Sequence, residues 1–306
     1  MKIKLRYYFV LFIRLIKDSI SELLINDPLR MAGATAFFTT FALPPILVIL
    51  IQAFKLVLGP MRIRNRLFET LAGIVGNEAV EQIKDILNAF RNLAHNWYVI
   101  LGGFIFLVFV ATTLFKIIKD SINQIWKIRV LERRAISSKL LERLQAVLVI
   151  LFAGILFVFG LLVETSQAFL GNYIQKLFPS LAFYFNNVVR TAFSVLFVTL
   201  WFAIMFRYLP DGRPRWKTAL TGAFVTSLLF NGGKVLLRFL LSYNNLNSIY
   251  GTSTSIVLLL LFVFYSSLIL YFGAAFTKVW SIYKKQPIKP LKYAVNYQIT
   301  IMHEER

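Results

Sequence analysis

Apolar residues in this chain are concentrated in long segments, and charged residues are concentrated between them. The hydrocarbon core of a bilayer is about 30 Å thick, so about 20 residues of α-helix, each rising about 1.5 Å, are needed to cross it. The pattern therefore predicts an all-α, polytopic membrane protein. The six predicted transmembrane helices are Met31–Leu58, Trp97–Ile118, Ala146–Leu170, Val188–Tyr208, Lys217–Ser242 and Thr254–Trp280.

Two further stretches have the pattern of helices that lie along a membrane surface. The chain from Lys4 to Ile25 is basic and apolar, and its polar residues gather on one face of its second half, which predicts an interfacial helix on the cytoplasmic leaflet. A secretory signal is less favoured, because basic residues interrupt the apolar run and no small-residue cleavage site follows. Helical spacing of apolar residues predicts an outer amphipathic helix at about residues 77–94. The polar residues that share one face of the segment Lys4–Ile25 are Arg14, Lys17, Asp18, Ser21 and Glu22.

These elements divide the chain into three parts. Residues 1–27 form the interfacial helix, residues 28–283 the transmembrane domain, and residues 284–306 a cytoplasmic tail. We expect Asp27 to cap the first transmembrane helix and Pro28 to occupy its first position, where a missing N–H is tolerated.

Composition agrees with a membrane protein and narrows the chemistry. Hydrophobic residues make up 58% of the 306 residues, above the roughly 45–50% that is typical of soluble domains. The mean hydropathy is +0.68. The chain has no cysteine, which excludes disulfides, thiolate nucleophiles and thiolate metal ligands.

The net charge of +20 follows the predicted topology. Of the 34 Lys and Arg residues, 23 fall in the N-terminal arm, residues 119–143, residues 207–217 and the chain from residue 278 onward, whereas the alternate loops hold six. An excess of Lys and Arg in cytoplasmic loops is the positive-inside rule, which predicts that both termini are cytoplasmic. The basic charge is thereby explained without nucleic acid, and it is compatible with anionic lipid headgroups.

The first transmembrane segment contains a predicted helix break. Adjacent Pro44 and Pro45 remove two helical hydrogen bonds and clash with the preceding turn, which contains Thr39 and Thr40. Broken transmembrane helices often mark the binding sites of transporters, because the freed backbone groups need protein or water as partners. The alternative is a packing kink in which the two threonine hydroxyls satisfy the freed groups.

The fifth segment carries a stripe of polar residues. Ser227, Asn231, Lys234 and Arg238 follow one another at spacings of four, three and four residues, so they share one helical face. A cation in the bilayer costs roughly 2.5–3.5 kcal/mol on insertion scales, so it faces protein or water, or extends to the interface. These four residues are the candidate binding site for an anionic substrate.

Glu164 is the one acidic residue within a predicted transmembrane segment. Counting about 1.5 Å per residue from the cytoplasmic side places it at nearly the depth of Lys234 and Arg238. An ion pair with either cation is therefore possible. Two interpretations remain open: Glu164 is a counter-ion or proton relay at the binding site, or it is a structural or interfacial residue.

The loops predict how neighbouring segments are arranged. Pro210 and the Asp211–Gly212 pair force a chain reversal, so the fourth and fifth helices are expected to be antiparallel neighbours. The basic stretch Lys119–Arg143 has a helical pattern. Small residues in the fifth helix allow close approach of another helix, and they are Gly222, Ala223, Gly232 and Gly233.

Three motifs are spaced along the predicted membrane domain. They are Gly33-Ala34-Thr35-Ala36-Phe37-Phe38 leading to Leu43-Pro44-Pro45, Arg207-Tyr208-Leu209-Pro210 with Trp216-Lys217, Ala219-Leu220 and Gly222-Ala223, and Tyr250-Gly251 with an apolar run to Gly273-Ala274. With these motifs the chain resembles the YihY/BrkB family of bacterial inner-membrane proteins over roughly residues 30–278. The resemblance implies six membrane spans and cytoplasmic ends, and it links the chain to export of envelope lipids.

An older label of that family, ribonuclease BN, has no support in the residues. A metal-dependent nuclease needs clustered Asp, Glu or His side chains to hold ions and activate water. The two histidines, His95 and His303, stand apart near the outer interface and in the tail, and no paired-carboxylate motif is present. We expect no catalytic residue, metal or cofactor, and no nucleic-acid partner.

Two functions compete for this pattern. The first is a transporter or exporter of an anionic solute or anionic lipid. Its partners would be membrane lipids and an anionic substrate whose phosphate or carboxylate group binds Lys234 and Arg238. The second is a non-transporting scaffold or regulator of envelope assembly, in which the interior charges are structural. An intramembrane enzyme is the weakest interpretation, because no nucleophile–base pair is evident.

Overall fold

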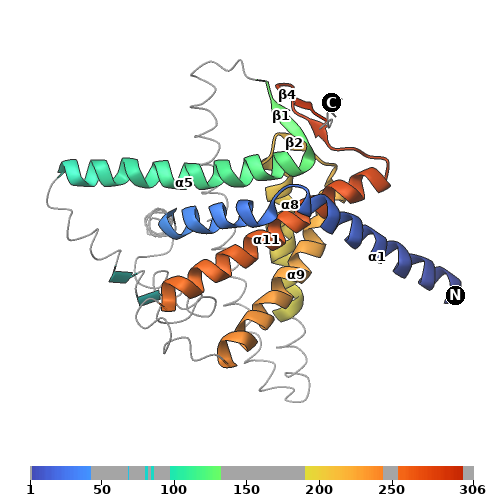
Figure 1. The fold of residues 1–306 in the computed structure, drawn as a ribbon, viewed down its shortest axis with the longest axis horizontal. Coiled ribbons are helices and arrows are strands. Elements are labelled where there is room, and N and C mark those ends of the chain that lie inside the picture. Colours follow the sequence, from blue (N-terminus) through green and yellow to red (C-terminus); the bar gives the residue numbers. More distant parts are fainter. Residues whose placement is uncertain are drawn as a thin grey trace, which may run out of the picture.

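A computed structural model describes residues 2–42, 97–131, 190–243 and 254–298, together with residues 68, 80, 81, 84 and 85. The predictions that concern Pro44, Pro45, Glu164, the histidines and the third transmembrane segment fall outside the described residues, as does most of the predicted outer helix. The described chain is mostly helical (Figure 1). Its helices are α1 (Lys2–Leu24), a helix over residues 28–42, α5 (Trp97–Trp126), α8 (Arg190–Tyr208), α9 (Trp216–Tyr243) and α11 (Thr254–Tyr283).

The helices arise where the sequence predicts them. Of the described helices, α8 over Thr191–Tyr208 and α11 over Val257–Tyr283 are long and apolar enough to cross a membrane. Only 22% and 39% of these two segments are buried inside the protein, which leaves much apolar surface on the outside. The helix α5 has 30 residues and α9 has 28, so both also reach the length of a span. The number of spans stays a prediction.

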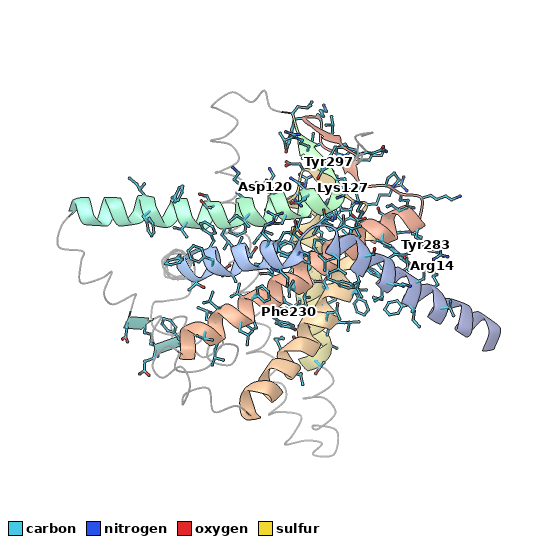
Figure 2. All side chains as sticks on the ribbon, viewed as in Figure 1. Arg14, Asp120, Lys127, Phe230, Tyr283 and Tyr297 are labelled. Carbon is cyan, nitrogen blue, oxygen red and sulfur yellow. The ribbon has the colours of Figure 1, made fainter. Side chains whose placement is uncertain are left out.

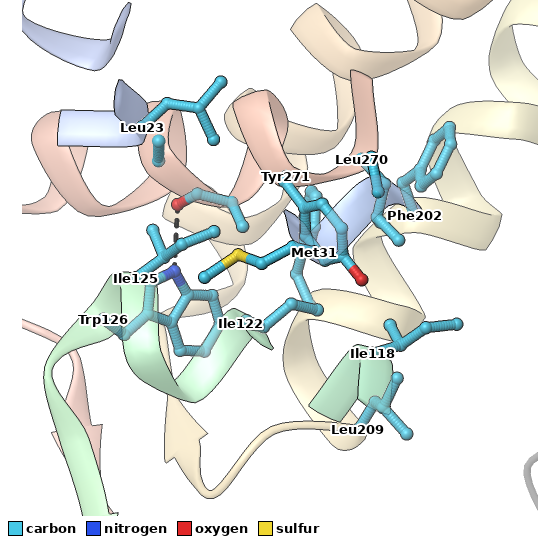
Figure 3. Close-up of a cluster of buried hydrophobic side chains, with 14 of the residues drawn as sticks. Leu23, Met31, Ile118, Ile122, Ile125, Trp126, Phe202, Leu209, Leu270 and Tyr271 are labelled. Carbon is cyan, nitrogen blue, oxygen red and sulfur yellow. Dashed lines mark hydrogen bonds between the residues drawn. The ribbon is translucent and has the colours of Figure 1, made fainter. Parts of the chain in front are cut away.

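The helix α11 is the centre of the described bundle. The helices α1, α5 and α9 all pack against it, and α8 packs against α9 (Figure 1). Where α5 meets α11, Trp126 donates an indole hydrogen bond of 2.9 Å to the carbonyl of Ala274, within a cluster of buried side chains that includes Ile122, Met31 and Tyr271 (Figure 3). This contact anchors the end of α5 on the last third of α11.

Four short strands at one end of the bundle depart from the all-α prediction. The strand β1 (Ile128–Val130) pairs antiparallel with β4 (Ala294–Asn296), and β2 (Gly212–Arg213) pairs antiparallel with β3 (Lys289–Pro290). The chain after α11 therefore folds back over the two turns that follow α5 and α8. We call this region, residues 127–131, 209–215 and 284–298, the strand end; the charge distribution predicts that it is cytoplasmic.

The prediction of a helix through Lys119–Arg143 is wrong for residues 127–131, because α5 ends at Trp126, and residues 132–143 lie outside the described residues. Lys127 has a left-handed backbone with φ of 56°, and its N–H bonds the Gln124 carbonyl. Residues 128–130 continue as a strand because the backbone of the C-terminal segment offers them partners. Those partners lie more than 160 residues away in the sequence, so local periodicity could not reveal them.

The predicted helix start at Pro28 is confirmed, with a different conformation at Asp27. The carbonyl of Asp27 accepts a hydrogen bond from the N–H of Met31, as the residue before a helix does. Its φ is 54°, however, so the residue is left-handed, and its carboxylate lies 3.8 Å from the guanidinium of Arg30. Asp27 lies in the short break, residues 25–27, that separates α1 from the next helix.

Candidate functional site

The polar face of α9 lies partly against α8. Ser227 is fully buried, and its hydroxyl donates a hydrogen bond of 2.9 Å to the carbonyl of Val195 in α8. The amide of Asn231 donates to the Ser227 carbonyl at 2.9 Å, while the hydroxyl of Ser194 donates to the Asn231 amide oxygen at 3.1 Å. The first half of the predicted stripe is therefore held in place by helix–helix contacts.

Lys234 continues this face beyond the contact with α8. Its ammonium lies 5.2 Å from the centroid of the Phe230 ring, one turn earlier in α9. Phe230 in turn packs edge-on against Phe202 of α8 at 5.9 Å and Phe262 of α11 at 6.3 Å. Cation–π attraction is worth about 0.5–2 kcal/mol, more when the cation is removed from water. The lysine is thus positioned on an aromatic cluster that three helices share.

This cation lies far from the strand end along α9. Lys234 follows Trp216, the first residue of α9, by 18 positions, which corresponds to about 27 Å of helix. Figure 2 shows Phe230 on the side of the bundle away from Lys127 and Tyr297 at the strand end. Arg238 lies on α9 one turn further on, with its side chain outside the description, and Glu164 lies outside the described residues. Their predicted pairing remains a prediction.

The backbone of α9 is held against α11 beside Lys234. A Cβ built on Gly233 would stand 1.2 Å from the Tyr265 phenol oxygen, so only glycine fits there. The Tyr265 hydroxyl donates to the carbonyls of Leu229 and Phe230 at 3.3 and 3.4 Å. The predicted close approach at Gly222 and Gly233 is confirmed, whereas Gly232 has no atom near its Cβ position.

The described part of the predicted helix break is regular helix. The hydroxyls of Thr39 and Thr40 donate to the carbonyls of Thr35 and Ala36 at 2.6 and 3.0 Å, within their own helix. The Thr35 hydroxyl also forms a 2.5 Å hydrogen bond with the buried phenol of Tyr271 in α11. These contacts place hydroxyl groups inside the bundle without a charged partner among them.

The structure adds a charged residue that the sequence indicated only as part of a turn. Asp211 is 1% exposed, and its carboxylate lies 2.9 Å from the Lys119 ammonium. It also accepts hydrogen bonds from the Asn123 amide at 2.7 Å and the Tyr293 hydroxyl at 3.0 Å, while its own N–H donates to the Asn123 side chain. Asp211 therefore joins α5, the α8–α9 turn and the C-terminal segment.

A second ion pair fastens α1 to the same end. The ammonium of Lys278 lies 2.8 Å from Glu22 in α1 and donates to the Ile125 carbonyl at 2.8 Å. The ammonium of Lys127 donates to the Asn26 side chain at 3.0 Å. Partial burial lowers the pKa of Lys127 below its ordinary value; Glu22 opposes this shift, and the nearby Lys278 cation adds to it.

No set of three or more His, Asp or Glu side chains in the described segments is arranged as a metal site requires. The charged groups that the structure brings together are instead opposite-charge pairs or cations on aromatic rings. Such groups can fix helices in place and attract anions, and they provide no nucleophile with a neighbouring base.

Comparison with known proteins gives consistent relationships at low identity. A family model described as Virulence factor BrkB matches residues 19–295. A UPF0761 membrane protein of Chromohalobacter salexigens is 26% identical over 287 residues, which cover 88% of this chain and 63% of the relative. Proteins of the same description from Idiomarina loihiensis and Psychromonas ingrahamii are 26% and 24% identical, over 69% and 93% of this chain and 70% and 91% of their own lengths.

The chain spans less than two thirds of several of these curated relatives, for example 63% of the Chromohalobacter protein and 59% of a UPF0761 membrane protein of Chromobacterium violaceum. No solved structure matches the chain.

Proposed function

Because the chain belongs to the Virulence factor BrkB family of bacterial membrane proteins, we propose that it moves an anionic solute or an anionic lipid headgroup across the inner membrane. In this proposal the chain is a multi-pass protein with the strand end and both termini in the cytoplasm, as the positive-inside rule predicts. The anion is bound on the polar face of α9.

The observation that carries the proposal is the position of Lys234. It is a partly buried cation about 27 Å along a 28-residue helix from the strand end, on the face that continues Ser227 and Asn231. An ionisable residue at such a place in a membrane helix is a functional site by default, because its insertion is unfavourable. A lysine ammonium attracts a phosphate or carboxylate as a compact charge.

The surroundings of Lys234 are suited to holding a charge in a fixed place. Asn231, one turn before, is oriented by Ser194, and the Phe230 ring beneath the ammonium is packed against two other helices. A preorganised cation loses little conformational freedom when an anion binds it. Arg238, four residues further along α9, would add a bidentate partner for phosphate on the same face.

A scaffold without transport is the second candidate, and a specific observation favours it. Ser227 and Asn231 form their hydrogen bonds with residues of α8 and with each other, as structural residues do. In that case Lys234 is a structural cation held by Phe230, and the protein acts through its surface. Glu164 then serves as a structural partner in place of a counter-ion.

The proposal is tested by reconstituting the full chain in proteoliposomes. The measured quantities are the initial rates at which a labelled phosphatidylglycerol and a labelled organic phosphate cross the bilayer, so that lipid and soluble anion are distinguished. Lys234→Met is expected to reduce the rate for one of these substrates at least 10-fold. The matched control is Lys284→Met, which removes another lysine that lies over an aromatic ring. Lys284 is at the strand end, and its ammonium lies 4.8 Å from the centroid of the Trp280 ring of α11.

The control is expected to transport at the rate of the unaltered protein. Protein-dependent transport that is equal in Lys234→Met, in Lys284→Met and in the unaltered chain would exclude a role for Lys234. Absence of protein-dependent transport of both anions would favour the scaffold.

A further inference from the structure

The turn between α8 and α9 gathers arginine and aromatic side chains at one point of the surface. The Arg207 guanidinium lies 5.2 Å from the centroid of the Trp216 ring, and the Arg213 guanidinium lies 5.4 Å from that of Tyr208. Tyr208 and Trp216 meet edge to face at 6.0 Å. These four residues, Arg207, Tyr208, Arg213 and Trp216, are called the arginine–aromatic cluster below.

Backbone contacts hold the two guanidinium groups in place. Arg207 donates a hydrogen bond to the carbonyl of Pro214, and Arg213 donates one to the carbonyl of Arg207. A guanidinium has five N–H donors, so each arginine keeps donors beyond these contacts. The cluster is therefore a rigid set of donors with two rings beside it.

The charge around the cluster is strongly positive. Arg215 and Lys217 are exposed directly beside it. The acidic residue of this turn, Asp211, is buried beneath and is engaged by Lys119 at 2.9 Å and by Asn123 and Tyr293. Its charge is thus paired inside the protein, and the outer face of the turn presents cations.

An apolar stripe runs from the cluster along α9. Trp216, Leu220, Phe224 and Leu228 recur every four residues, and each is between 41% and 48% exposed. Residues at this spacing lie on one face of a helix. The stripe therefore continues from the aromatic ring at the strand end toward the middle of the helix.

A second stripe runs along α8. Leu196, Leu200 and Tyr208 share one face at multiples of four residues and are 64%, 43% and 53% exposed. Because Tyr208 touches Trp216, both stripes end at the same cluster. The surface thus combines a cationic head region with two apolar stripes, each of which extends over 12 positions, or about 18 Å of helix.

We propose that this surface is a binding site for an anionic glycerophospholipid of the cytoplasmic leaflet. The lipid phosphate would lie against the two arginines of the cluster and against the neighbouring Arg215 and Lys217. The aromatic rings would lie at headgroup depth, and the acyl chains would follow the two stripes. A zwitterionic lipid gains less from the surplus of cations, and a soluble phosphate makes no use of the apolar stripes. The site is about 27 Å along α9 from Lys234, and it does not depend on transport.

The site is tested by native mass spectrometry of the full chain in a neutral detergent, with phosphatidylglycerol, phosphatidylcholine or inorganic phosphate added separately. The unaltered chain is expected to bind phosphatidylglycerol at least 5-fold more tightly than phosphatidylcholine. The double variant Arg215→Gln/Lys217→Gln is expected to lose most of that preference. Trp216→Leu, which removes the ring but keeps both charges, is expected to weaken both lipids.

The matched control is Lys285→Gln/Lys292→Gln, which removes two exposed lysines elsewhere at the strand end. It is expected to keep the preference within 2-fold. An equal loss in both double variants would show attraction by net charge alone and would overturn the site. A full preference in Arg215→Gln/Lys217→Gln, or inorganic phosphate that binds as tightly as phosphatidylglycerol, would also overturn it.

Discussion

Gly222 of α9 lies directly against Thr277 of α11. A Cβ built on Gly222 would stand 1.9 Å from the Thr277 hydroxyl oxygen, and a Cβ built on Gly273 of α11 would stand 1.9 Å from the hydroxyl oxygen of Thr226 in α9. Each threonine donates to the carbonyl of the glycine four residues earlier in its own helix, at 2.7 Å. The two helices thus meet through the same glycine–threonine pair in reciprocal arrangement.

The reciprocal contact predicts that Gly222→Ala destabilises the protein. The added methyl group overlaps with Thr277, and overpacking of this kind costs about 1–3 kcal/mol. We expect a lower midpoint of thermal unfolding in detergent. The double variant Gly222→Ala/Thr277→Ala removes the hydroxyl and should recover part of the loss.

Gly232→Ala is the matched control, because Gly232 lies in the same helix with no atom within 4 Å of its Cβ position. Alanine is favoured over glycine in a helix by up to about 1 kcal/mol, so this variant should be as stable as the unaltered protein or more stable. Equal losses in Gly222→Ala and Gly232→Ala would mean that the contact between α9 and α11 is not tight at Gly222.

Asp211→Asn is expected to unfold the strand end. Removal of one partner of a buried ion pair leaves the other charge uncompensated, at a cost of about 3–5 kcal/mol, and here Lys119 is left with a neutral amide. The measurement is the rate of limited proteolysis between α11 and the C-terminal strands, which should increase strongly.

Asp27→Asn serves as its control. The Asp27 carboxylate lies 3.8 Å from Arg30, and both side chains are more than half exposed, so the pair is worth at most about 1 kcal/mol. Its proteolysis pattern should be unchanged. A resistant Asp211→Asn protein would show that the hydrogen bonds of Asn123 and Tyr293 suffice without the charge.

Lys285→Gly is predicted to stabilise the protein. Lys285 has φ of 53° after the end of α11, where the N–H groups of Lys285 and Gln286 bond to the Ile282 and Ser281 carbonyls at 2.9 and 2.8 Å. This is a Schellman motif, in which glycine is the usual left-handed residue. A residue with a Cβ is unfavourable in this left-handed conformation, and glycine removes that cost. Part of the gain is offset because glycine loses more conformational freedom on folding, so the net stabilisation is about 0.5–1 kcal/mol.

The thermal midpoint of Lys285→Gly should therefore rise, whereas Lys285→Ala keeps a Cβ and should show no gain. A rise in both variants would attribute the effect to loss of the lysine charge and not to the backbone.

The lowered pKa of Lys127 makes the stability of the protein depend on pH in the alkaline range. This pKa is lowered in the folded protein, so folding favours the neutral amine. The stabilising contribution of this group is fully present above the unfolded pKa, 10.5, and is lost as the pH falls through the folded value. Relative to Lys127→Met, which retains the same backbone strain, the unaltered protein should gain thermal stability as the pH rises from 8 to 11. A difference that stays constant across this range would contradict the shift.

The described helices were predictable from the sequence because their signals are local. Apolar runs and the Pro210–Asp211–Gly212 turn predict α8 and α9 as antiparallel neighbours, and the structure confirms their packing. The helical spacing of Ser227, Asn231 and Lys234 likewise placed them on one face. What spacing could not show is the partner of that face, since Val195 and Ser194 become its neighbours only through the packing of α8.

The strand end could not be predicted because its strand pairings and the side-chain partners of Asp211 are distant in the sequence. The strand β1 has three residues and β2 has two, too short for an alternating pattern to be recognised, and each pairs with the segment after α11. Asp211 resembled an ordinary turn residue, and its partners Lys119 and Tyr293 lie 92 and 82 positions away. Nothing in the local sequence distinguishes a buried aspartate from an exposed one in such a turn.

The account depends most on the charge of Lys234, and one comparison in proteoliposomes tests it directly. The initial rate for labelled phosphatidylglycerol or the labelled organic phosphate is measured for the unaltered chain, Lys234→Met and Lys234→Arg. We predict that methionine abolishes most of the protein-dependent rate and that arginine, which restores the positive charge over the Phe230 ring, recovers a substantial part of it. A rate that is the same with methionine as with lysine would contradict the account.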